Sequence, residues 1–81
     1  MNWIATFYSH FGAVRFLQQC KAAGISARLA PVPRDLSSSC GTCARYTADS
    51  FCPVSPVPEE VEQIAQVLPQ GYRVEYRAEN S

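Results

Sequence analysis

Two cysteines separated by two residues are the clearest chemical signal in the sequence. Cys40 and Cys43 form a Cys-x-x-Cys motif, a spacing that brings two sulfur atoms close enough to form a disulfide, to hold a metal ion or to pass a sulfur atom between thiols. A serine run precedes the motif and a strand-prone stretch follows it, whereas thioredoxin-like motifs place the first cysteine at the start of a helix after a strand. The surroundings therefore argue against a thioredoxin-like motif.

Basic and small residues flank this motif. Arg34 and Arg45 lie on either side of it, and nearby positive charge favours a thiolate or persulfide. Gly41 would let a substrate or a partner's backbone approach the sulfur closely. Backbone N–H groups between residues 37 and 41 could form an anion-binding nest. These features predict that Cys40 is the functional thiol, with its anion stabilised by the two arginines.

The remaining cysteines leave alternatives open. Cys52, in a Cys-Pro-x-x-Pro sequence, is either a resolving thiol or a small buried hydrophobic residue. Together with Cys40 and Cys43 it offers three ligands for zinc or an iron–sulfur cluster, whose fourth ligand would have to be Cys20 or His10. Cys20, however, lies on an apolar helical stripe and is expected in the core, and His10 is expected to cap a helix or to carry protons near the thiols.

Hydrophobic periodicity predicts six elements around these residues. Residues 3–8 read as a central strand, 10–23 as a helix capped by Ser9 and Gly24, 27–32 as an edge strand containing prolines, 44–47 as a short strand, 58–68 as the clearest amphipathic helix and 72–77 as a half-buried strand. The second helix is expected to start at Pro58, because Glu59 and Glu60 follow it and apolar residues recur at Val61, Ile64, Ala65 and Leu68.

The order β-α-β-β-α-β over 81 residues predicts an α+β fold. We expect one domain, residues 1–81, with a ferredoxin-like sandwich in which two helices cover one face of a four-stranded antiparallel sheet. The first and third strands would be central, and the second and fourth would be edges. The open sheet face, carrying Tyr and Ile side chains, could serve a homodimer or a structural partner.

Charge and composition exclude several classes of protein. Seven basic and seven acidic residues give a formal charge of zero, which argues against a sequence-independent nucleic-acid binder and against a polybasic membrane peptide. The sequence holds no apolar run long enough to span a bilayer, and its start does not read as a signal peptide. We therefore expect a cytoplasmic protein, where a functional thiol is more common than a disulfide that closes a loop.

Two segments and the closing elements carry a family resemblance. Residues 5–9 and 31–41, in which the pair Pro33-Arg34 leads through a serine run to Cys40-Gly41, are similar to a bacterial family of unknown function described as selenium/sulfur carrier protein-like. The resemblance implies a small cytoplasmic protein, alone or fused behind a sulfur-relay-type domain, that holds sulfur or selenium on a cysteine. Cys43 and Cys52 are additional to the simplest family pattern.

The leading hypothesis is a non-enzymatic carrier without a cofactor. Cys40 would accept sulfur or selenium as a persulfide or selenosulfide from a donor such as a cysteine desulfurase and pass it to an acceptor. Arg34 and Arg45 would stabilise the anion, and Cys43 would resolve the adduct by thiol–disulfide exchange. The alternative is an adaptor module that binds zinc or an iron–sulfur cluster through Cys40, Cys43 and Cys52.

Overall fold

The computed structural model describes residues 1–54 and 56–78. These residues form the following elements: β1 (Asn2–Phe7), α1 (His10–Ala22), β2 (Ala27–Pro31), β3 (Thr42–Thr47), β4 (Val61–Leu68) and β5 (Gly71–Arg77). The predicted α+β class is confirmed, but the two-helix ferredoxin-like sandwich is wrong, because the second expected helix is a strand. Within the described ranges no helix is long and apolar enough to cross a membrane.

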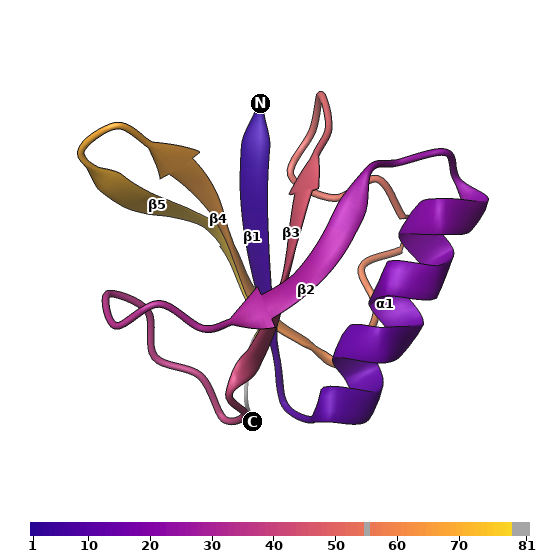
Figure 1. The fold of residues 1–81 in the computed structure, drawn as a ribbon, viewed down its shortest axis with the longest axis horizontal. Coiled ribbons are helices and arrows are strands. Elements are labelled where there is room, and N and C mark those ends of the chain that lie inside the picture. The colour runs from indigo at the N-terminus through magenta and orange to yellow at the C-terminus, as the bar shows by residue number, and fades with distance from the viewer. Residues whose placement is uncertain (55, 79–81) are drawn as a thin grey trace.

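The five strands form one antiparallel sheet in the order β2-β3-β1-β4-β5, and α1 lies against one of its faces (Figure 1). The central place of β1 matches its prediction, since its side chains are apolar on both faces. β2 and β5 are the edges, as expected. Pro31 ends β2 at an edge, where a residue without an N–H group interrupts no inner ladder.

The signals at both ends of α1 work as predicted. The Ser9 hydroxyl accepts a hydrogen bond from the Gly12 backbone N–H at 3.2 Å, which satisfies one of the free donors of the first turn. At the other end Gly24 adopts a positive φ of 75°, and the Ile25 N–H donates to the Cys20 carbonyl at 2.8 Å. This is a Schellman-type cap, which requires the left-handed conformation that glycine adopts without strain.

The segment expected as the second helix is β4. Its helix-start signals form a single turn instead, in which the Val61 N–H donates to the Pro58 carbonyl at 3.1 Å. From there β4 pairs with β1 on one side and with β5 on the other. Val61 and Ile64 face the helix side of the sheet, and Ala65 faces the other side. Apolar residues on both faces of an inner strand thus imitate a helical stripe, and pairing along the whole of β1 overrides helix propensity.

Two clusters of buried side chains lie on the two faces of the sheet. The helix-side core combines α1 with the sheet residues Trp3, Ala5, Phe7, Ala44, Tyr46, Val61 and Ile64. The loop-side core, Ile4, Cys43 and Ala65, is covered by Val32 and Leu36 from the connection between β2 and β3. The second face is therefore not the open surface that we expected: Ile4 on this face is fully buried, in the cluster on which the connection packs.

Candidate functional site

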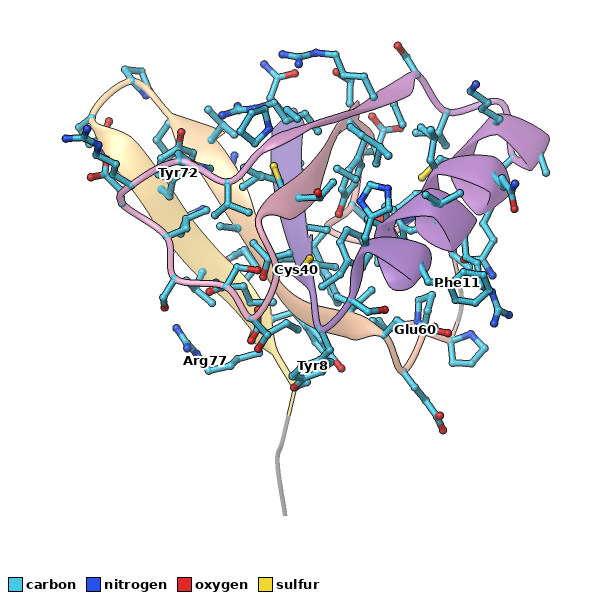
Figure 2. All side chains as sticks on the ribbon, turned by 60° about the horizontal axis from the view of Figure 1, so that its bottom comes forward. Tyr8, Phe11, Cys40, Glu60, Tyr72 and Arg77 are labelled. Atoms are coloured by element: carbon cyan, nitrogen blue, oxygen red, sulfur yellow. The ribbon has the colours of Figure 1, made fainter. Side chains whose placement is uncertain are left out.

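The connection between β2 and β3, residues 32–41, is called the serine loop here. Its base is closed by a hydrogen bond from the Val32 N–H to the Gly41 carbonyl at 3.1 Å, and a turn joins the Leu36 N–H to the Pro33 carbonyl at the same distance. Figure 2 shows the loop running across the sheet, with Cys40 where it returns toward β3. Because Val32 and Leu36 pack on the loop-side core, the loop is anchored by apolar burial as well as by its closed base.

Two neighbouring side chains of β4 hold the serine loop in place. The Glu62 carboxylate accepts from the Ser39 backbone N–H at 3.1 Å, from the Ser39 hydroxyl at 2.7 Å and from the Thr6 hydroxyl at 3.2 Å. The Gln63 side-chain amide donates to the Ser37 carbonyl at 2.7 Å. A polar backbone segment is thus bonded to side chains of an inner strand, which fixes the approach to Cys40.

The carboxylate of Glu62 accepts hydrogen bonds from serine-loop groups that we expected to bind a sulfur anion. Burial acts to raise its pKa, but the hydrogen bonds from Ser39, Thr6 and Ser38 outweigh burial and leave the pKa lowered. The Ser39 N–H is thereby taken, and the Cys40 N–H donates to the Ser38 hydroxyl at 3.3 Å. At these two positions the predicted anion nest does not face a thiolate.

Cys40 is half-buried at the end of the sheet and contacts the helix-side core. Its thiol donates to the Thr42 carbonyl at 3.4 Å, and the Thr42 hydroxyl is hydrogen-bonded to Nδ1 of His10 at 3.1 Å. His10 is the first residue of α1. The structure therefore brings the first turn of the helix, an exposed imidazole and the Cys-x-x-Cys motif together.

The second thiol of the motif lies on the opposite face. Cys43 is fully buried in the loop-side core, and its thiol donates to the Pro31 carbonyl at 3.5 Å. Burial raises its pKa, against the lowering effect of Arg45 and Arg28, while Cys40 adds to the rise. The two thiols are near enough to interact electrostatically, but only Cys40 is partly accessible to solvent.

The structure separates the two arginines that were expected to act together. Arg34 is exposed within the serine loop. Arg45 lies on the loop-side face and donates to the Tyr72 hydroxyl at 3.4 Å, and its electrostatic effect is exerted on Cys43. No contact among the described residues joins Arg45 to Cys40. Gly41 is exposed, with open space where a side chain would be, so a partner has room beside Cys40.

Cys52 and Cys20 form a separate pair on the helix side. The Cys52 thiol donates to the Val54 carbonyl at 3.1 Å, and burial raises its pKa. Cys20 is fully buried in the helix-side core, as predicted. Burial, with a contribution from Cys52, raises the pKa of Cys20 to about 11. In the described part of the chain no three potential ligands are grouped to hold a metal ion.

Sequence reasoning missed the residues that hold the loop. Glu62 was expected on the solvated first turn of a helix, and Gln63 carried no signal at all. Their roles follow from β4 being a strand, because only then do these side chains lie beside the ends of β1 and the serine loop. The adjacent polar residues Glu62 and Gln63 near the start of this inner strand are the one hint that the sequence contains.

Comparison with known proteins identifies the family of this chain. A family model described as "Putative Se/S carrier protein-like" matches residues 2–78, a range that contains the serine loop, the Cys-x-x-Cys motif and every helix and strand described above. No curated protein and no solved structure matches the chain. Since the family model covers nearly the whole sequence, the chain belongs to the Se/S carrier protein-like family.

Proposed function

We propose that this protein is a non-enzymatic carrier that holds sulfur or selenium on Cys40. The observation that supports the proposal is the contrast within the motif: Cys40 is partly exposed in an anchored loop, whereas its neighbour Cys43 is sealed in the core. A carrier needs one accessible sulfur at a defined position and must shield other thiols from it. The family's description points the same way.

The loading step is a transfer of sulfane sulfur. The thiolate of Cys40 attacks the outer sulfur of a donor's persulfide, a new S–S bond forms on Cys40, and the donor leaves as a thiolate, so that no external oxidant or reductant is needed. Arg34, exposed in the same loop, is the cation we expect to approach the persulfide anion. His10, hydrogen-bonded to Thr42 inside the motif, is placed to exchange protons near the sulfur.

Cys43 remains the proposed resolving thiol. Its thiolate would attack the inner sulfur of the persulfide on Cys40, forming a Cys40–Cys43 disulfide and releasing hydrosulfide. Burial and a raised pKa keep this thiol protonated and covered in the folded state. Discharge is therefore slow until the serine loop opens, and the loaded form lasts long enough to be delivered.

The proposed partners are a sulfur or selenium donor, such as a cysteine desulfurase, and an acceptor protein in the cytoplasm. A docking partner would approach at Gly41, where the backbone is open to solvent. The geometry supports the metal-binding adaptor less well, because Cys52 lies beside Cys20 on the helix side and Cys43 lies in the loop-side core.

Intact-mass analysis after incubation with a cysteine desulfurase and cysteine tests the proposal. The wild-type protein is expected to gain one sulfur atom, Cys40→Ser none, and the matched control Cys52→Ser as much as the wild type. Cys43→Ser should load normally and keep its sulfur longer. Absence of loading on the wild type, or equal loading on Cys40→Ser, would contradict the carrier role, and a stoichiometric metal lost on Cys43→Ser would favour the adaptor.

A further inference from the structure

A hollow on the loop-side face of the sheet has no place in the proposed carrier chemistry. It is a cavity of about 340 Å³, and its polar lining comes from β1, from β3 and from the residues at and before the start of β2: Asn2, Ser26, Arg28, Arg45 and Thr47. The serine loop, which packs on the loop-side core through Val32 and Leu36, contributes no residue to its lining.

Two arginines are placed opposite each other in this hollow. Arg28 on β2 and Arg45 on β3 are register partners of an antiparallel pair, so their side chains leave the same face of the sheet. Like charges directly opposite each other destabilise a sheet. Neither arginine belongs to the ion pairs of the described residues, which are Arg15–Glu60 and Arg73–Glu75, and no carboxylate lines the hollow.

The rest of the lining combines Trp3, Ala27, Tyr46 and Val67 with the polar side chains of Asn2, Ser26 and Thr47. The Thr47 hydroxyl donates to the Asn2 side-chain oxygen at 2.9 Å, which fixes the amide so that both of its N–H groups stay available. Ser26 adds a hydroxyl. The positive field of the two arginines reaches the buried thiol of Cys43, where both act to lower the pKa. The hollow thus combines uncompensated positive charge with several hydrogen-bond donors.

We propose that this hollow binds a tetrahedral oxyanion of the phosphate class through Arg28, Arg45 and Asn2. A tetrahedral oxyanion can accept hydrogen bonds from two guanidinium groups and an amide at once, whereas a carboxylate has only two oxygens to share among them. Bound phosphate would also remove the repulsion between the facing arginines. The site does not depend on the proposed function, because none of its lining residues is proposed to accept or pass on sulfur.

A titration with inorganic phosphate, followed by backbone amide NMR at constant ionic strength, tests this site. We expect saturable shifts at residues 2, 26, 28, 45 and 47. Arg28→Gln and Arg45→Gln should each weaken binding about tenfold, because each removes a charge-assisted contact. Lys21→Gln makes the same charge change at an exposed position of α1, and it should change binding less than twofold. Arg28 is itself exposed, so its variant is expected to fold, and the spectrum reports on that directly.

Further ligands identify the source of the oxyanion. Tighter binding of glycerol 3-phosphate than of phosphate, with no binding of glycerol, would support a phosphate monoester as the ligand, and equal binding would support the free ion. Acetate binding as tightly as phosphate would overturn the tetrahedral assignment. Shifts that do not saturate, or undiminished binding by Arg28→Gln, would overturn the site itself.

Discussion

Two irregular segments each carry a half-buried cysteine that packs against the helix-side core, and side chains of different kinds hold these segments in place. The serine loop is bonded to the polar side chains Glu62 and Gln63 of β4. Residues 48–54 and 56–60 pass along the helix side (Figure 1) and contact its core through Ala48, Cys52 and Val57. The serine loop is thus held by side-chain hydrogen bonds as well as by the burial of Val32 and Leu36, whereas the other segment is held by contacts with the helix-side core.

The contacts of the helix-side segment illustrate the contrast. The Trp3 indole donates to the Ala48 carbonyl at 3.0 Å, the Tyr46 hydroxyl donates to the Phe51 carbonyl, and the Phe51 ring stacks on Tyr76 with centroids 6.0 Å apart. Aromatic residues thus provide most of the attachment. Burial disfavours the charged thiolate, and the pKa of Cys52 is raised accordingly.

Alkylation of the native protein at neutral pH should show the largest difference. We expect iodoacetamide to modify Cys40 first and Cys52 more slowly, with Cys20 and Cys43 reacting only on unfolding. For Cys20 the pKa of about 11 in place of 9.0 alone lowers the thiolate fraction about a hundredfold. Peptide mass spectrometry at several reaction times measures the order. Faster reaction of Cys52 than of Cys40 would reverse the proposed contrast.

Replacing Glu62 should release the serine loop. Glu62→Ala removes the acceptor of Ser39 and Thr6, and we expect it to lower the free energy of unfolding by about 2 kcal/mol, the scale of hydrogen bonds to a charged group. Urea unfolding measures this change, with exposed Glu59→Ala as the matched control. Alkylation of Cys40 should accelerate while that of Cys52 stays constant; a variant in which both rates rise equally would show that the two segments are not independent.

Replacing Tyr46 should have the complementary effect on the other segment. Tyr46→Phe keeps the ring in the helix-side core but removes the hydroxyl that donates to Phe51, and we expect a loss of about 1 kcal/mol in the free energy of unfolding. Alkylation of Cys52 should then accelerate and that of Cys40 should not. An unchanged rate at Cys52 would mean that its shielding comes from the core alone.

The smallest expected effect is a dependence of stability on acid pH. Because the pKa of Glu62 is lowered in the folded state, its stabilisation is complete above the unfolded pKa and is lost as pH falls through the folded pKa. The difference in unfolding free energy between wild type and Glu62→Gln should shrink by less than about 1 kcal/mol between neutral pH and pH about 3. An unchanged difference would show that the hydrogen bonds do not depend on the charge.

Local signals predicted much of this fold. The cap at Ser9 and the left-handed Gly24 act within a few residues, and the structure confirms them. The last strand is present, but its expected alternation is not kept: Val74 is exposed, and Tyr72 and Tyr76 pack on opposite faces of the sheet. The prediction of a helix over residues 58–68 failed because the strand that determines their structure is distant in sequence. β4 pairs with β1, more than 50 residues earlier in the chain. An apolar set that serves both faces of an inner strand resembles a helical stripe, and only the pairing distinguishes them.

The candidate site shows the same division. The Cys-x-x-Cys motif and the buried place of Cys20 could be read from the sequence. The face of the sheet on which each thiol lies could not be read from the sequence, because it depends on where β3 begins. β3 begins at Thr42, inside the motif. Because the strand begins there, the side chain of Cys43 lies in the loop-side core, whereas Cys40 precedes the strand. The roles of Glu62 and Gln63 depend in turn on β4, so they were beyond local reasoning.

The most direct test of the central claim is to map where sulfur resides after loading. The wild-type protein is loaded by a cysteine desulfurase, its persulfides are trapped by alkylation in the folded state, and the peptides are analysed by mass spectrometry. The fold described here predicts one trapped persulfide on the peptide that contains Cys40 and none on those containing Cys20 or Cys52. A persulfide found mainly on Cys52, or distributed over all peptides, would contradict it.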